Sequence, residues 1–280
     1  MACNVASRRS PNNVKRHRAS VLEFHVLITP VSSASPGSCP RQCKDCRLRA
    51  LEAFQPVTPQ ELDFIQDFRS GVALAPAGTS IISEQNPNGK LFTLYAGWAF
   101  RYKTLSDGRR QILNFLLPGD LIGLQQEFAD GASHGVEALT DAALCVFPRD
   151  GLWDLFRQFP SLGYDVTWLS AREEAMVDEN LLTTGRRNAA ERVAMLLIHL
   201  YRRVERLGLA TEGVIDFPIT QQHIADALGL SLVHTNKTLR RLTQLGLHEL
   251  RDGRLRLLNP RALHRLADYY DLPMRRVPLL

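Results

Sequence analysis

The sequence predicts an α+β protein with an antiparallel β-roll in its first half, a long helix in the middle, and a small helical domain with a β-hairpin at its end. Three observations support this fold class. Short apolar stretches between residues 72 and 147 are separated by turn residues. A four-three spacing of mostly apolar positions spans residues 162–180. Two short helical patterns and a hairpin pattern follow one another between residues 220 and 257.

The composition sets the outer limits. The chain has 280 residues, 45% of them hydrophobic, and no uninterrupted apolar run of membrane-spanning length. We therefore expect two domains with separate cores and no membrane partner. The positive charge is concentrated at the end, where residues 186–280 contain sixteen Lys and Arg against nine Asp and Glu. This distribution favours a polyanionic partner such as nucleic acid for the last third of the chain.

A short helix, Pro59–Phe68, is expected to precede the roll. The strand patterns that follow are separated by Pro76-Ala77-Gly78, Ser106-Asp107-Gly108 and Pro118-Gly119-Asp120. Strands this short, with no helix between them, indicate an antiparallel roll rather than a parallel α/β sheet. The expected strands are Val72–Leu74, Thr79–Ile82, Leu91–Tyr95, Trp98–Thr104, Arg109–Leu116, Gly135–Ala138 and Ala142–Phe147.

After Arg149 the pattern becomes helical, with a seam of six positions separated by alternating steps of four and three residues. A stripe of this kind needs a partner surface. It is either the chain's own roll or the same helix of a second copy, and we assign the seam to a homodimer interface because it continues into a second domain. The seam consists of Leu162, Val166, Leu169, Glu173, Met176 and Asn180.

The most informative part begins at Thr220, a good N-cap for a helix over Gln221–Leu228. The turn Gly229-Leu230-Ser231 then leads into a second helix that ends near Gln244. Two helices joined in this way are typical of a helix-turn-helix, whose second helix enters the major groove of double-stranded DNA. A hairpin with an Asp252-Gly253 turn follows directly and predicts a wing.

Several side chains of this unit are candidates for DNA contacts. Asn236 is matched to adenine and Lys237 to guanine by their hydrogen-bonding groups. Arg240 and Arg241 are expected to bind phosphates, which adds affinity without reading the sequence. The complete set of candidates is Thr220, Gln221, Ser231, Val233, His234, Asn236, Lys237, Arg240 and Arg241.

The five cysteines are Cys3, Cys39, Cys43, Cys46 and Cys145, an odd number in which three members stand close together. This pattern is unlike a disulfide framework and favours a reducing compartment, the cytoplasm. Residues 1–38 are basic and rich in Ser and Pro, and we interpret them as a disordered tail.

Several motifs resemble those of the Crp/Fnr family of bacterial regulators, and in particular its Fnr/FixK branch. They are Ser106–Ile112, Phe115, Pro118–Gly123 and Arg187–Ala194. The resemblance covers about residues 39–270. It implies a sensor domain over residues 39–150 with a jelly roll like that of cyclic-nucleotide-binding domains, a dimerisation helix over 151–185, and a winged helix-turn-helix over 186–280. It also implies a transcription regulator that binds a palindromic operator as a homodimer and works with RNA polymerase.

The resemblance also bears on cofactors. Regulators that bind cyclic AMP hold its phosphate with a Gly-Glu pair and an Arg, whereas this chain has Gly123-Leu124-Gln125 and no Lys or Arg between residues 110 and 149. Cyclic AMP is therefore not expected. The Fnr branch binds an iron-sulfur cluster with three N-terminal cysteines and one from the roll. Cys43, Cys46 and Cys145 match these ligands, while Glu52 occupies the remaining position. Either Cys39 or the Glu52 carboxylate would complete the site.

A departure in the second helix concerns the operator. Many family members carry Glu-x-x-Ser-Arg at the positions of Val233, Asn236 and Lys237. Without the carboxylate and the forked guanidinium, a different half-site is expected.

Three hypotheses remain open from the sequence. The chain is a regulator with an iron-sulfur or thiol sensor, a cofactor-free regulator controlled by its expression or by protein contacts, or an enzyme of the cupin type. The enzyme is disfavoured because the roll contains a single histidine, His134, whereas a catalytic metal needs a cluster of ligands.

Overall fold

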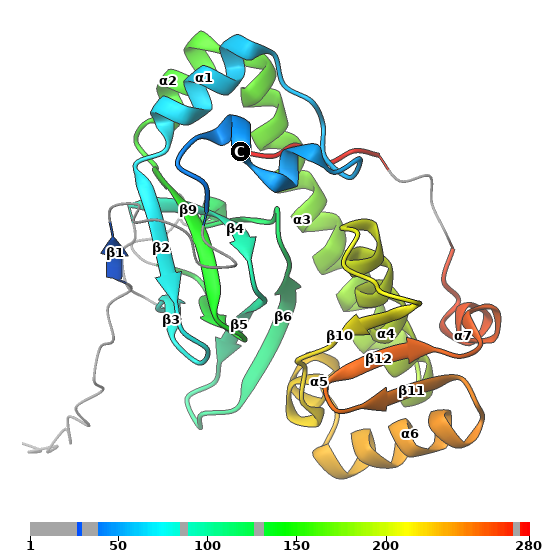
Figure 1. Cartoon of the computed structure of the whole chain (residues 1–280). Coiled ribbons are helices and arrows are strands. Elements are labelled where there is room, and N and C mark those ends of the chain that lie inside the picture. Colours follow the sequence, from blue (N-terminus) through cyan, green and yellow to red (C-terminus); the bar gives the residue numbers. More distant parts are fainter. Residues whose placement is uncertain (1–26, 30–38, 85–88, 126–131, 271–274) are drawn as a thin grey trace, which may run out of the picture.

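A computed structural model of the chain describes residues 27–29, 39–84, 89–125, 132–270 and 275–280. The roll and the C-terminal domain are joined by a long helix that runs from one to the other (Figure 1). Within the described residues, no helix is long and apolar enough to cross a membrane.

The roll consists of two antiparallel sheets, as the strand patterns predict. One sheet has the order β1-β2-β9-β4-β7 and the other the order β3-β8-β5-β6. Their facing sides bury one apolar cluster that includes Phe92, Leu94 and Leu144, whereas Phe100 and Phe147 belong to a second cluster shared with the helices. The strands are β2 Gly71–Ala75, β3 Ser80–Ile82, β4 Lys90–Ala96, β5 Ala99–Thr104, β6 Arg110–Leu116, β7 Leu121–Ile122, β8 Gly135–Ala138 and β9 Ala142–Pro148.

The expected disordered tail needs one correction. Leu27–Thr29 forms strand β1 and pairs antiparallel with β2, so the tail is not disordered throughout. The free edge of β2 would leave backbone N–H and C=O groups without partners. A short segment with β-branched residues can pair with these groups as a further strand. Residues 1–26 and 30–38 lie outside the described residues.

Short helices connect the cysteine-bearing segment to the roll. The 3-10 helices η1 (Cys43–Asp45) and η2 (Arg47–Ala50) precede α1 (Pro59–Phe68). Helix α1 begins where expected because Thr58 and Glu61 form a capping box, in which each side chain binds the other residue's backbone N–H.

Two helices occupy the region expected to form one dimerisation helix. Helix α2 (Leu152–Gln158) ends at Phe159, and α3 (Pro160–Arg186) starts at the proline, which favours the first helical position. The seam of α3 faces its own chain. Leu162, Val166 and Leu169 are at most 5% exposed.

The polar members of the seam also make contacts within the chain. Glu173 accepts a hydrogen bond from buried Arg101 of β5 at 2.6 Å, and Asn180 donates to the carbonyl of Leu113 at 2.7 Å. Met176 contacts Asn114, with 4.0 Å between Sδ and Nδ2. Leu162, Val166, Leu169 and Glu173 are buried within their own chain and are therefore removed from the predicted dimer interface. Met176 is half-buried and Asn180 is exposed, and for these two the dimer contact stays a prediction.

The C-terminal domain packs around α4 (Ala189–Arg206), which starts at a capping box formed by Asn188 and Glu191. It continues with β10 Val214–Asp216, α5 Gln221–Leu228, α6 Leu232–Gln244, β11 His248–Arg251, β12 Arg254–Leu257 and α7 Pro260–Ala267. The three strands form one antiparallel sheet of order β10-β12-β11.

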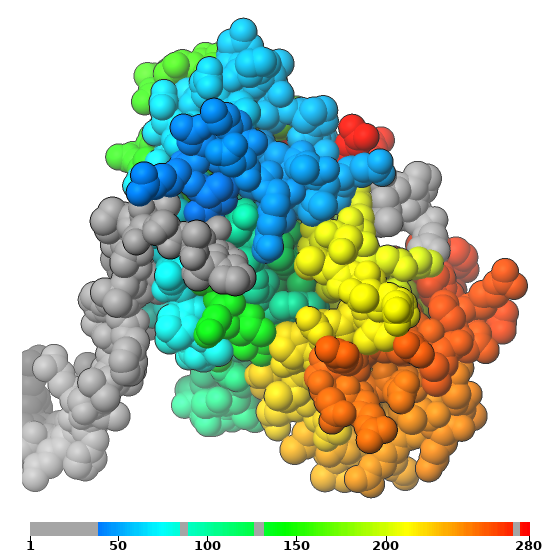
Figure 2. All heavy atoms as spheres, in the orientation of Figure 1, coloured from blue at the N-terminus to red at the C-terminus, as the bar shows by residue number. Residues whose placement is uncertain are grey.

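The end of the chain returns to the N-terminal half. Val277 pairs with Phe54 through a backbone bridge, and Arg49 donates to the carbonyl of Leu279 at 3.2 Å. Val277, Leu279 and Leu280 are buried. The cysteine-bearing segment, blue in Figure 2, also adjoins the yellow end of α4, where Phe54 and Leu207 line one shallow pocket.

Candidate nucleic-acid interface

The two helices of the reading unit begin at the residues that the sequence indicates. The Thr220 hydroxyl accepts from the backbone N–H of His223 at 3.2 Å, and the Ser231 hydroxyl accepts from that of His234 at 3.2 Å. Gly229 ends α5 with a φ of 62°, a left-handed conformation in which a side chain is strained. These local bonds set the tight turn between α5 and α6.

Helix α6 is anchored by one face and exposed on the other. Leu239 and Leu242 are buried, and so are Thr235 and Thr238, with Thr238 donating to the carbonyl of His234 at 2.8 Å. Leu232, by contrast, is 42% exposed. These small hydroxyl residues allow the helix to pack close to its neighbours. Because threonine is not strongly apolar, its burial is hard to predict from the spacing of apolar residues in the sequence.

The exposed face of α6 carries residues that are expected to contact DNA. Lys237, Arg240 and Arg241 are exposed, the helix contains no acidic residue, and no salt bridge engages these cations within the described part of the chain. Together with Val233, Asn236 and Gln244 they line a shallow groove. Thr220, Gln221, Ser231 and His234 are exposed at the adjoining helix starts, and Asn236 is half-buried with its side-chain oxygen unpaired among the described residues.

The wing has the predicted hairpin geometry. Asp252 and Gly253 have φ values of 51° and 71°, as a two-residue hairpin turn requires. The hairpin exposes Arg251, Arg254 and Arg256, which our sequence analysis did not select as DNA contacts. The alternation of arginines with Leu255, which is fully buried, was the signal that could have identified them.

A buried acid connects the roll to the helices that carry the reading unit. Asp120, in the turn after β6, accepts from Arg203 of α4, from Arg172 of α3 at 3.3 Å and from the backbone N–H of Leu117 at 2.8 Å. Burial raises the pKa of Asp120, but the two arginines outweigh it and hold the pKa below its usual value. The carboxylate therefore stays charged and bonds both helices to the roll.

Further bonds attach the reading unit to strand β6. The Gln111 side chain donates to the carbonyl of Ala227 at 3.0 Å, and Arg203 donates to that of Phe115 at 2.8 Å. The His223 ring packs on Phe100 with 5.4 Å between ring centroids. The orientation of α5 and α6 is thus tied to the roll.

The structure gathers four cysteines at one end of the roll. Cys39, Cys43 and Cys145 are buried and Cys46 is half-buried. The sulfurs of Cys39 and Cys145 are 3.7 Å apart. The hydrogen bond with Cys39 lowers the pKa of Cys145 to about 7, and Arg69 and Arg49 add to this effect through their charge.

The side chains around these cysteines are a poor set of ligands for the iron-sulfur cluster that the resemblance implies. Glu52 is exposed, although the cysteines it would join are mostly buried. Among the residues that the structure describes, no three Cys, His, Asp or Glu side chains are grouped closely enough to hold a metal ion. We therefore derive no step through a cluster, and cluster binding stays a prediction.

Comparison with known proteins identifies both halves of the chain. Residues 74–159 match the cyclic nucleotide-binding domain model, and residues 191–266 match the Crp-like helix-turn-helix domain model. The nitrogen fixation regulation protein FixK of Rhizobium meliloti is 32% identical over 200 residues, which cover 70% of this chain and 87% of that protein. The transcriptional activator protein FnrL of Cereibacter sphaeroides is 27% identical over 76% of this chain and 86% of its own.

A solved structure agrees with these matches. FixK2 from Bradyrhizobium japonicum superposes with a TM-score of 0.64 at 30% identity, covering 70% of this chain and 96% of that one. The relatives are transcription regulators, which excludes the cupin-type enzyme. The chain therefore belongs to the Crp/Fnr family of DNA-binding transcription regulators.

Proposed function

We propose that two copies of this chain bind a palindromic operator, each inserting α6 into the major groove. The observation that carries the proposal is the exposed face of α6, which has three cations and no acid. Two copies related by a two-fold axis would present two such helices, and this symmetry requires a palindromic site.

The side chains of α6 divide into two roles. Asn236 and Lys237 lie near the helix start and read base edges, while Arg240 and Arg241 bind phosphates. Arg251, Arg254 and Arg256 of the wing add phosphate contacts. Val233, 79% exposed, offers an apolar contact, such as to a thymine methyl group.

Binding to selected and random DNA tests this division of roles. We expect Lys237→Ala to reduce the ratio of specific to random affinity, and Arg241→Ala to weaken both about equally and to lower the salt slope by about 1.8, one phosphate in each of two copies. Lys44→Ala, an exposed cation in η1 of the roll, serves as the control and should change neither. Equal loss on both DNAs from Lys237→Ala would contradict base reading.

We place the dimer contact on a second face of α3. Opposite the buried seam, a second set of positions repeats with the same four-three spacing. Tyr164 is 69% and Leu182 48% exposed, and the small residues Ala171 and Ala175 permit close approach of a second helix. The proposed dimer face is Tyr164, Trp168, Ala171, Ala175, Asp178 and Leu182.

Light scattering of the purified protein tests this face. We expect Leu182→Glu to produce monomers, because two like charges would oppose each other across the two-fold axis. Leu105→Glu changes a leucine that is 58% exposed in the hairpin between β5 and β6 and should remain dimeric. A dimeric Leu182→Glu protein would refute the proposed face.

A redox response is supported by the contact between Cys39 and Cys145. Their sulfurs, 3.7 Å apart, need only a small approach to form a disulfide. Hydrogen peroxide would accept two electrons and two protons from the two thiols, giving one S–S bond and two waters. Cyclic AMP is not part of this proposal.

Mass spectrometry after peroxide treatment should find a peptide linking Cys39 to Cys145, absent in Cys145→Ser, and a change in operator affinity in the same samples. Unlinked thiols at full peroxide exposure would contradict the disulfide. The spectrum of anaerobically purified protein tests the alternative sensor, since iron-sulfur absorption would assign these cysteines to a cluster instead.

The cellular compartment that we propose follows from the chemistry of the cysteines. Free thiols persist in the reducing cytoplasm, which is where we place the protein. The relative FnrL is a transcriptional activator protein, which supports RNA polymerase as the partner at the promoter. Transcription with purified polymerase from an operator-bearing template should change when the protein is added, and an unchanged transcript level would remove this partner.

A further inference from the structure

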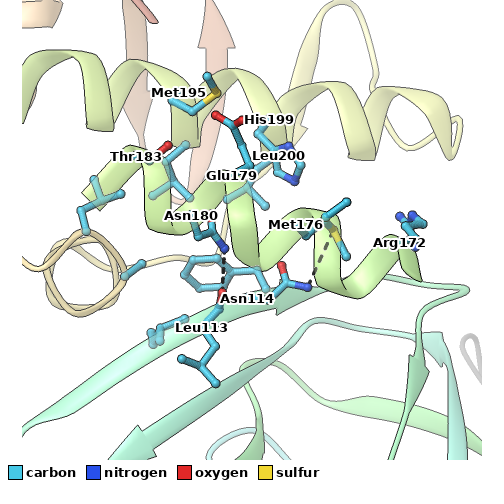
Figure 3. A pocket seen from close by; sticks show the side chains of 16 residues that line it. Leu113, Asn114, Arg172, Met176, Glu179, Asn180, Thr183, Met195, His199 and Leu200 are labelled. Carbon is cyan, nitrogen blue, oxygen red and sulfur yellow. Dashed lines mark hydrogen bonds between the residues drawn. The ribbon is translucent and has the colours of Figure 1, made fainter. Parts of the chain in front are cut away.

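A cavity of about 210 Å³ lies between the roll, helix α3 and the C-terminal domain, away from the groove of α6 and from the cysteines. In Figure 3 the α3 side chains lie between Met195 and His199 of α4 and Leu113 and Asn114 of β6. Ala227 and Leu228, at the end of α5, complete the lining. Strand β6, α3, α4 and the end of α5 therefore all contribute a wall.

The lining is mainly apolar and adaptable. Ile112, Phe115, Leu196 and Leu200 supply aliphatic and aromatic surface. Two of the chain's four methionines, Met176 and Met195, face the same space. Methionine is flexible and polarisable, so its side chain adjusts to ligands of different outline. An apolar cavity of about 150 Å³ is large enough to bind benzene, so this one has room for a ring with a few further atoms.

The charges at the cavity are already paired. Arg172 binds Asp120 at 3.3 Å, and Glu179 accepts from Arg187 at 2.7 Å. A charged ligand would lose its hydration without gaining an unpaired counter-charge here, which disfavours carboxylates and phosphates. The lining thus selects for uncharged molecules.

The His199 ring is a polar group that remains available to a ligand. Within the described part of the chain no hydrogen bond engages the His199 ring, which borders the cavity. Burial, with the nearby charges of Arg203 and Arg172, lowers the pKa of His199 to about 3, so the ring is neutral at pH 7. A neutral imidazole offers one N–H donor and one nitrogen acceptor to a ligand.

From this lining we infer that the cavity is a binding site for a small, uncharged aromatic molecule with one hydrogen-bonding group, which pairs with His199. The site is bracketed by bonds between the roll and the other elements, from Asn180 to Leu113 and from Gln111 to Ala227. A bound ring contacts both domains at once and so favours one orientation of α5 and α6. This effect on operator affinity rests on the proposed DNA-binding function, whereas the binding itself does not.

Methyl NMR with indole as the probe tests the site directly. In protein labelled at the methionine methyls, we expect indole to shift two of the four resonances, those that disappear in Met176→Leu and Met195→Leu. His199→Phe should weaken indole binding about tenfold, the equivalent of one hydrogen bond, and leave binding of indene, which lacks the N–H, unchanged. Leu105→Phe, at an exposed leucine in the hairpin between β5 and β6, is the control and should bind both as the natural chain does.

The unmodified protein by itself can refute the inference, so the test does not require that any variant folds. Absence of a shift in all four methionine methyl resonances at millimolar indole refutes the site. Because DNA binding is measured on the same sample, a protein that binds its operator but not indole separates failure of this inference from failure of the proposed function.

Discussion

Replacing Asp120 by asparagine should strongly destabilise the protein. The carboxylate is 5% exposed and faces Arg203 and Arg172, whose side chains are 12% and 23% exposed. Asparagine keeps the shape but removes the charge, so two largely buried guanidinium groups lose their counter-ion. Breaking a buried pair in this way costs about 3–5 kcal/mol. We expect a loss of that size in the free energy of unfolding.

The assay is urea denaturation followed by circular dichroism at pH 7. Asp107→Asn is the matched control, because Asp107 is exposed and its pairing with Arg109 is open to water, and its midpoint should be unchanged. The pKa of Asp120 is lowered in the folded state, so its contribution is present above the usual carboxyl pKa and is lost as the pH falls below about 4. Equal midpoints for Asp120→Asn and Asp107→Asn would refute the role of the buried acid.

Two further predictions concern stability. Burial, with the charges of Arg101 and Lys103, lowers the pKa of His134 to about 4 from an ordinary 6.5, so its contribution is complete above pH 6.5 and is lost towards pH 4. Unfolding free energies at pH 7 and pH 5 should differ by about 2 kcal/mol more in the natural chain than in His134→Gln, and equal differences would contradict this. Leu279→Ala should lower the unfolding free energy by about 2 kcal/mol, because this residue of the C-terminal tail is 3% exposed, whereas Leu258→Ala, 50% exposed, should cost less than about 0.5 kcal/mol. Matching urea midpoints for the two leucine variants would show that the tail does not pack on the cysteine-bearing segment.

Much of the fold was predictable because its signals are local. A helix start depends on a side chain that reaches three residues ahead, and Thr58, Asn188, Thr220 and Ser231 all cap as such a pattern requires. A two-residue hairpin depends on positive φ at Asp252 and Gly253. The cationic face of α6 was identifiable for the same reason, since helical spacing alone places its members side by side.

The predictions failed where the spacing of residues had to identify the surface that a helix or strand contacts. The seam from Leu162 to Asn180 was correctly identified as a contacting stripe, but spacing is the same whether a stripe packs on its own roll or on a second copy. Thr235 and Thr238 are buried in the anchoring face of α6 while Leu232 is 42% exposed, because the burial of a side chain depends on what lies opposite it in the fold. The pairing of β1 with β2 likewise depends on an edge that forms only when the sheet does.

The sequence by itself determined the order of elements, the turns, the helix caps and the basic reading helix, since each arises from interactions over a few residues. Only the tertiary structure decided that Asp120 holds two arginines from different helices, that the last residues return to the cysteine-bearing segment, and that a cavity opens between the domains. These features join positions up to 230 residues apart. Their energies depend on distance and burial in three dimensions, and no spacing along the chain records either.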